Sequence, residues 1–271
     1  IYLRETGQLQ IQNRFGVFRT DSGLSAMAPV AAFPSFVTGR EIQDGKIVSV
    51  TASPDGKYLT YQKPVSAGYA DLMLFDLRNG VEVLITKGVK LSYSDPGALW
   101  SQDSRFFVYA RGGNLYYYSV AQYQERRVLS EDFRKLGKGR IANLQWAPDG
   151  RLYFLSGSLV YQIMSAEFFT RSLYSDLLQI GRIVGKIPFE FDPNFDRFWI
   201  SPDGTKILLD KGGRNVFLYF LSEDDFSSAG TETSLPYLYL PRNTGVLDVL
   251  WTKTDTITVL TGSIRNKADS T

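Results

Sequence analysis

The chain has 271 residues and a nearly balanced charge, with 30 Lys and Arg against 28 Asp and Glu and a net charge of +2. This balance gives no general attraction to nucleic acid or to an anionic membrane surface, and no apolar run approaches the roughly 18 residues of a membrane-spanning helix. The sequence has no Cys and no His, which excludes disulfides, thiol nucleophiles, Ser-His-Asp triads and most zinc sites, and we expect no metal and no cofactor.

The first expected elements are two short strands at residues 1–5 and 9–12, separated by a Thr-Gly turn signal. They are similar to the second half of a later repeat, so we interpret residues 1–12 as a partial unit. Residues 13–46 interrupt the periodic pattern. Because Pro29 and Pro34 would interrupt a helix, we interpret this stretch as an insertion or linker. The alternative is an amphipathic partner-binding segment.

From residue 47 onward, one turn motif recurs. Ser-Pro-Asp-Gly at 53–56 returns at 201–204, and Ala-Pro-Asp-Gly stands at 147–150. Weaker copies stand near residues 103 and 255, so the aspartates are separated by 48, 46, 54 and 52 residues. Pro sets φ at the first central position of a turn, Asp bonds its own backbone two residues on, and Gly supplies the positive φ. We therefore interpret all five aspartates as structural turn residues rather than catalytic or metal-binding groups: Asp55, Asp103, Asp149, Asp203 and Asp255.

A hydrophobic run precedes each turn and another follows it, so each repeat begins with a strand, a tight turn and a strand. Four-stranded units are expected at about 47–86, 98–130, 141–177 and 197–240, with a partial unit at 246–263. A Trp precedes four of the five turns, at 100, 146, 199 and 251, and we interpret it as packing between neighbouring sheets. A period near fifty is typical of a radially repeated β architecture.

The two ends of the chain have complementary patterns. Residues 1–12 lack a preceding first and second strand, and residues 246–260 lack the third and fourth. If the chain is complete, residues 1–5 should pair with 256–260 and remove an exposed edge. If it is a fragment of a longer array, the two ends should lie apart. We favour the fragment, because residues 263–271 read as an interrupted loop.

Ser-Pro-Asp-Gly-Lys at 53–57, a β run, a short polar loop and Asp-Leu-Met-Leu-Phe-Asp-Leu at 71–77 resemble the blade of TolB-type, WD-repeat-like β-propellers. These are related to the propeller domains of prolyl oligopeptidase-type proteins. The resemblance covers about 47–263. It implies an all-β propeller of four-stranded antiparallel blades, four of them complete and one split or partial. It also implies a periplasmic or otherwise extracytoplasmic bacterial setting, but it does not specify a function, because propellers host many activities.

The resemblance further implies that the Ser-Pro-Asp-Gly turns lie on one face, and that the loops between second and third strands and the links between units lie on the opposite face. That opposite face would carry a basic set with two tyrosines, and these are the candidate binding residues: Lys63, Tyr69, Tyr93, Arg111, Arg134, Arg140, Lys211, Arg214 and Arg242. The hypothesis is a protein partner with an acidic surface. The alternative is that these residues are ordinary solvated loop positions.

We therefore expect a noncatalytic scaffold for protein–protein interaction in a bacterial envelope assembly. One alternative is the gating propeller of a serine peptidase whose catalytic domain lies outside this chain, since no Gly-x-Ser-x-Gly elbow appears here. A carbohydrate-binding or carbohydrate-cleaving propeller is the other, and it would need acids that converge on a channel. The acids weighed for it show no diagnostic spacing: Asp95, Glu190, Asp192, Asp196 and Asp248.

Overall fold

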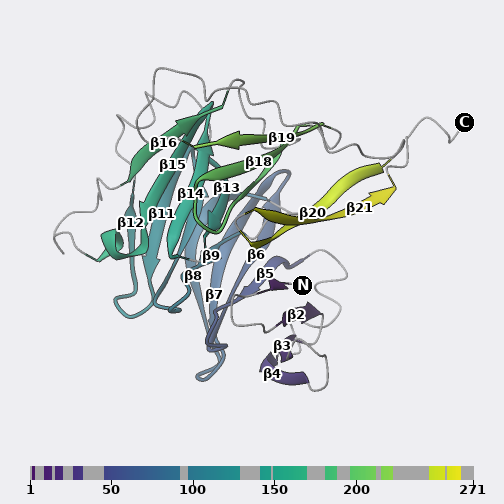
Figure 1. Ribbon diagram of the computed structural model, residues 1–271. Helices are drawn as coiled ribbons and strands as arrows, with labels where there is room; N and C mark the ends of the chain where they lie inside the picture. The colour runs from purple at the N-terminus through teal and green to yellow at the C-terminus, as the bar shows by residue number, and fades with distance from the viewer. Residues whose placement is uncertain are drawn as a thin grey trace, which may run out of the picture. The chain divides into compact units, whose positions relative to one another are not determined.

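The computed structural model is built almost entirely of antiparallel β-strands (Figure 1). It describes residues 2–3, 9–13, 16–20, 27–32, 46–91, 97–128, 141–147, 149–169, 181–187, 196–211, 215–221, 244–253 and 255–263. The one helix in these ranges is a 3-10 turn, η1 (Ser165–Phe168). The chain divides into two units, Ile1–Phe133 with Phe168–Ile180, and Arg134–Glu167 with Gly181–Thr271. Each unit has its own sheets and core.

The first unit contains three four-stranded sheets. In each sheet, strands adjacent in sequence are paired antiparallel, as short connections favour. The first sheet consists of β1 (Tyr2–Leu3), β2 (Leu9–Asn13), β3 (Gly16–Thr20) and β4 (Met27–Ala32). The second consists of β5 (Val48–Ala52), β6 (Tyr58–Ser66), β7 (Tyr69–Asp76) and β8 (Val81–Lys90). The third consists of β9 (Leu99–Trp100), β10 (Phe106–Arg111), β11 (Asn114–Ser119) and β12 (Gln124–Arg127).

The first sheet departs from the expected organisation. Strands β3 and β4 lie within 13–46, the stretch interpreted as an insertion or linker, so that stretch supplies half of a sheet. Pro29 is compatible with this arrangement because β4 is an edge strand, where a missing N–H need not interrupt a ladder. A register shift between Val17 and Phe18 lies opposite this part of β4.

The second unit contains the remaining sheets. A four-stranded sheet consists of β13 (Ile141–Trp146), β14 (Arg151–Ser156), β15 (Leu159–Met164) and β16 (Arg182–Lys186). Three strands form the next, β17 (Arg197–Ile200), β18 (Lys206–Lys211) and β19 (Asn215–Phe220). Two form the last, β20 (Thr244–Lys253) and β21 (Thr256–Ser263). The third repeat unit was expected to end near residue 177, but its fourth strand, β16, lies beyond that residue. The reason is that the connection from β15 to β16 is longer than a hairpin turn.

Neighbouring sheets pack face to face through apolar side chains. In the first unit, Leu72 and Leu74 of β7 belong to the same buried cluster as Trp100 and Phe107 of the next sheet. The Trp100 indole N–H donates to the Thr60 hydroxyl, 3.1 Å away. This contact confirms that Trp100 packs between two sheets.

In the second unit, the same stacking occurs twice. Tyr153 and Leu155 of β14 share a core with Phe198, Leu209 and other residues of the β17–β19 sheet. The opposite face of that sheet contacts β20 and β21 through a second cluster, which includes Trp199 and Trp251. Sheets stacked in sequence order are the arrangement expected for propeller blades.

The strand pairing near the two chain ends is local. Strand β1 pairs with β2 and β21 pairs with β20, and within the described ranges no ladder joins β1 to β21. The pairing expected for a ring closed by 1–5 and 256–260 is therefore not observed in the part of the chain that the structure describes.

Candidate functional site

The turn that precedes β6 is organised around the Asp55 carboxylate. Its Oδ1 accepts a 2.7 Å hydrogen bond from the Ser53 hydroxyl and a 3.2 Å bond from the Lys57 amide. The Lys57 ammonium lies 2.7 Å from Oδ2. The Gly56 amide donates to the Ser53 carbonyl and the Ser53 amide to the Tyr58 carbonyl, so the carboxylate holds a closed β-turn, as Asp does in this position.

The other turn aspartates are also bonded within the fold, and two of them repeat the Ser–Asp bond. Asp103 and Asp203 each accept from a serine hydroxyl two residues earlier, at 2.7 and 2.6 Å. Asp149 accepts from the Arg151 amide at 3.0 Å. Asp255 lies in the β20–β21 turn and pairs with the Lys206 ammonium. In each case the carboxylate is used within the fold.

These contacts lower the pKa of two turn carboxyls. Partial burial raises the pKa of Asp55, but the bonds from Lys57 and Ser53 outweigh it and hold this pKa below its ordinary value. For Asp203, burial again raises the pKa, and the bonds from Ser201 and Thr205 bring it below its ordinary value. Both groups are held as carboxylates at neutral pH.

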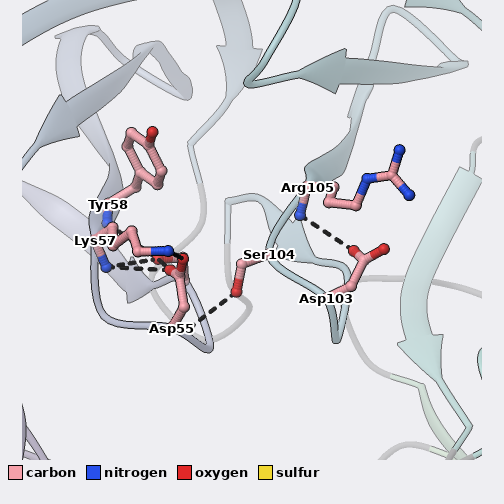
Figure 2. Close-up of polar contacts among 7 residues, drawn as sticks. Asp55, Lys57, Tyr58, Asp103, Ser104 and Arg105 are labelled. Carbon is pink, nitrogen blue, oxygen red and sulfur yellow. Dashed lines mark hydrogen bonds and ion pairs between the residues drawn. The ribbon is translucent and has the colours of Figure 1, made fainter.

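Two successive turns of the first unit are joined directly, as Figure 2 shows. The backbone amide of Asp55 donates a 2.9 Å hydrogen bond to the Ser104 hydroxyl. Ser104 occupies the fourth turn position, where Gly stands in the complete motif, and has a φ of +61°. The turns of these two sheets therefore lie at the same end of the first unit, and the loops after β6 and β10 belong to the opposite strand ends.

Of the predicted binding residues, Lys63, Tyr69, Arg111 and Lys211 are described, and each lies at or near the far end of a strand from the Asp turns. Lys63 and Tyr69 belong to the β6–β7 hairpin, Arg111 to the end of β10, and Lys211 to the end of β18 in the second unit. The others lie outside the described residues: Tyr93, Arg134, Arg140, Arg214 and Arg242.

The cations of this set have carboxylate partners within the chain. The Lys63 ammonium lies 2.6 Å from Glu82. Arg111 lies 3.4 Å from Glu125 and stacks 4.2 Å over the Tyr116 ring. These pairs reduce the positive potential that the residues would offer to an acidic partner.

At the β18 end, Lys211 lies 3.5 Å from the buried carboxylate of Asp196. Beside it, Arg197 forms a 2.8 Å pair with the fully buried Asp210 and donates to the Val246 carbonyl of the next sheet. Asp196 was weighed as a carbohydrate-cleaving acid, and here it belongs to an ion pair.

Of the remaining acids weighed for that chemistry, Asp95, Glu190 and Asp192 lie outside the described residues, and Asp248 is described only as part of β20.

The tip of the β6–β7 hairpin has one feature that was not predicted from the sequence. Val65 is 59% exposed and lies near Tyr69, which is 55% exposed, and every residue from 65 to 69 is exposed. Strands β6, β7 and β8 have 9, 8 and 10 residues, against 6, 6 and 4 in β10, β11 and β12.

Among the residues whose positions are described, no three His, Cys, Asp or Glu side chains gather in a metal-binding group. In the same ranges, no helix has the length and apolar character needed to span a bilayer.

No protein-family model matches the sequence, and no curated protein does. Solved structures are similar in fold. KlHsv2 with loop 6CD replaced by a Gly-Ser linker is 10% identical, with a TM-score of 0.51 over 98% of this chain and 76% of that one. TolB from Acinetobacter baumannii is 19% identical, with a TM-score of 0.38 over 78% and 49%. The β-propeller domain of the Trilobed protease from Pyrococcus furiosus is 9% identical, with a TM-score of 0.44 over 74% and 59%.

The chain spans about half the length of TolB and about three fifths of the protease propeller domain. At these identities the likeness concerns the fold alone. Together with the sheet topology, it confirms the predicted fold class, an all-β propeller of four-stranded antiparallel blades.

Proposed function

We propose that this protein is a noncatalytic β-propeller scaffold that binds another protein through the tip of the β6–β7 hairpin. The observation that carries this proposal is the pair of exposed apolar side chains at the tip, Val65 and Tyr69. Tyrosine contributes a large, stiff contact area with one polar group and is enriched at protein interfaces. Leaving both side chains in water has no benefit for the folded chain alone.

The charges around the tip define the surface that a partner should present. Lys90 is the cross-strand neighbour of Tyr69. Lys87, three residues earlier on β8, is exposed. Lys63, nearer the middle of β6, is paired with Glu82. The tip therefore suits an apolar pocket rimmed by carboxylates, which is a narrower requirement than a generally acidic surface.

The noncatalytic part of the proposal rests on the use of the described carboxylates. The turn aspartates hold β-turns, and Asp196, Asp210 and Glu82 form ion pairs. A general acid or base needs a carboxyl group whose proton is available to a substrate. We further propose a bacterial extracytoplasmic setting, on the resemblance of the Ser-Pro-Asp-Gly blades to the TolB type.

A photo-crosslinking experiment tests the binding surface. A benzophenone amino acid replaces Tyr69 in one variant and Tyr123 in another, because Tyr123 is 65% exposed and lies in the β11–β12 connection. Crosslinking is carried out in an envelope extract of the source organism. We expect a discrete crosslinked protein from position 69 and none from position 123.

The crosslinked protein is then purified and its affinity measured by titration calorimetry. Tyr69→Ser should weaken binding about 30-fold, the loss expected for an interface hot spot, and Val65→Ser should weaken it several-fold. The matched variants Tyr123→Ser and Val81→Ser should bind as the wild type does. Equal crosslinking from both positions, or affinities that ignore Tyr69 and Val65, would refute the proposed surface.

A further inference from the structure

The turn between β7 and β8 contains the only Asn-Gly step of the sequence, Asn79–Gly80. Both residues are exposed. The Gly80 amide donates a 2.9 Å hydrogen bond to the carbonyl of Asp76, the last residue of β7, and Gly80 has a φ of +67°. A Cβ added at Gly80 would meet nothing within 4 Å. No other part of the chain therefore crowds the Gly80 nitrogen or hinders a group that approaches it from Asn79.

The Asp76 carboxylate holds the asparagine in place. Its Oδ1 accepts hydrogen bonds from the backbone amides of Arg78 and Asn79, at 2.8 and 3.1 Å. Its Oδ2 accepts a 2.8 Å bond from the Asn79 side-chain amide. Slight burial raises the pKa of Asp76, but these bonds outweigh it and keep the group a carboxylate at neutral pH. Asp76 thus restrains both the Cγ carbonyl group of Asn79 and the nitrogen of Gly80.

The other Asx-Gly steps that the structure describes differ from this one in their side-chain chemistry. They are the three Asp-Gly steps of the repeated turns, at 55–56, 149–150 and 203–204, and their glycines are half-buried whereas Gly80 is exposed. The pKa values of Asp55 and Asp203 are held below their ordinary value, and Asp149 pairs with Arg151 at 2.9 Å. A carboxylate anion resists attack by a nitrogen nucleophile, because its carbon already carries excess electron density. The neutral amide of Asn79 does not have this protection.

We propose that Asn79 is a site of spontaneous deamidation and that its contacts with Asp76 set the rate. Hydroxide removes the proton of the Gly80 amide, and the Gly80 nitrogen attacks Cγ of Asn79 to close a five-membered succinimide ring. The Cγ–Nδ2 bond breaks, and Nδ2 takes up a proton and leaves as ammonia. Water then opens the ring at either carbonyl, which leaves aspartate or isoaspartate at position 79. The sum is one water consumed and one ammonia released, with no oxidation.

The folded turn should slow this reaction without preventing it. Ring closure requires that the Gly80 N–H leave the Asp76 carbonyl and that the Asn79 side chain turn away from Asp76 Oδ2. Both movements are confined to an exposed turn, so they need local opening rather than unfolding of the sheet. In an unstructured peptide the same two groups are free from the start.

The reaction would change the turn permanently. An aspartate at position 79 places a second carboxylate where an amide N–H now donates to Asp76, and two carboxylates in contact repel each other. An isoaspartate routes the backbone through the side chain and lengthens it by one methylene group. The β7–β8 turn lies at the other end of these strands from the β6–β7 tip, so the inference does not depend on the proposed function.

Peptide mapping by mass spectrometry tests the reaction. The full chain and a free peptide of residues 72–84 are incubated in mildly alkaline buffer, and conversion at position 79 is followed over time. We expect conversion in both, slower in the folded chain by about tenfold or more because of the required opening. The three Asp-Gly steps of the folded chain should remain intact over the same period.

Substitution of Asp76 tests its part in the rate. Asp76→Ala should speed conversion of the full chain about fivefold or more, because the bonds that restrain Asn79 are lost, and should have little effect in the free peptide. The matched control is Asp55→Ala, which removes the carboxylate of another turn in the same sheet, and it should leave the rate at position 79 unchanged. Circular dichroism checks that both variants fold.

The product is tested by Asn79→Asp, with Asn79→Ser as a variant that loses the same hydrogen bond without gaining a charge. Asn79→Asp should unfold at a lower urea concentration than Asn79→Ser, and the gap should narrow at high salt, which screens the repulsion.

Three results would overturn the proposal. Position 79 keeps its amide in the folded chain while the free peptide converts completely, or an Asp-Gly step of the folded chain reacts first. Equal rates for Asp76→Ala and Asp55→Ala would show that general loosening of the sheet, and not the contacts of Asp76, controls the reaction.

Discussion

Replacing Gly204 by alanine should destabilise the protein far more than the same replacement at Gly80. Gly204 closes the turn between β17 and β18 with a φ of +71°, and Gly80 closes the turn between β7 and β8 with a φ of +67°. A side chain in this left-handed region costs about 1–2 kcal/mol. That backbone cost is common to the two positions, so any difference between them comes from packing.

The packing differs sharply. A Cβ added at Gly204 would overlap the hydroxyl oxygen of Tyr153 and lie 3.1 Å from Cζ of that ring, whereas at Gly80 it would meet nothing within 4 Å. Tyr153 is fully buried, and its hydroxyl accepts a 2.6 Å bond from Gln162. Overpacking against a fixed ring costs about 1–3 kcal/mol. We therefore expect Gly204→Ala to lose about 2–5 kcal/mol of unfolding free energy, and Gly80→Ala about 1–2 kcal/mol.

Urea unfolding followed by tryptophan fluorescence measures both losses. A double-mutant cycle with Tyr153→Phe isolates the clash, because removal of the hydroxyl should recover about 1 kcal/mol or more in the Gly204→Ala background. If the two alanine variants are equally stable within about 0.5 kcal/mol, or if Tyr153→Phe recovers nothing, the hydroxyl is not what requires glycine at this turn.

Three further changes test the turns and the ion pairs. Ser104→Ala should lower the unfolding free energy by about 1–2 kcal/mol in a urea titration, because the Asp55 amide loses its acceptor. Ser104→Gly should be nearly neutral, because glycine adopts the positive φ of this position without the strain of a side chain. Equal losses from the two variants would contradict this reasoning. The pKa of Asp203 is lower in the folded protein than its ordinary value of 3.8. The carboxylate therefore stabilises the fold above pH 3.8, and this stabilisation is lost as the pH falls through the folded-state pKa. Asp203→Asn should flatten the acid side of a stability-versus-pH curve, and an unchanged curve would argue against the lowered pKa. Asp210→Ala should cost about 1–3 kcal/mol in thermal unfolding, because the fully buried carboxylate that accepts from Arg197 is lost, and Asp210→Asn should cost less.

The fold was largely predictable because its turns depend on local chemistry. Ser-Pro-Asp-Gly specifies a turn through φ preferences and short-range hydrogen bonds, and those preferences are properties of the residues themselves. The 13–46 stretch lacks this motif and contains Pro29, so nothing local distinguishes β3 and β4 from a linker. Strand β16 was misplaced for a related reason, since its position depends on the length of a connection that carries no turn signal.

The candidate site was less predictable because its properties depend on contacts between strands. Lys63 and Arg111 read as available cations in the sequence, but Glu82 and Glu125 reach them from other strands. The exposure of Val65 depends on how far the β6–β7 hairpin extends relative to its neighbours. Neither effect has a signal within a few residues of the side chain concerned.

The stacking of sheets in sequence order has a consequence for how such a gene can change. Within each unit, a sheet buries its faces against the sheets adjacent to it in sequence, so its stability depends mainly on nearest neighbours. A duplicated segment of about fifty residues, inserted at one of the Asp turns, would form one new sheet. One face of that sheet would pack on the preceding sheet, and its other face would pack on the following one. Gene length in this lineage should therefore change in steps of one sheet, and single-residue insertions should be confined to the connections between sheets.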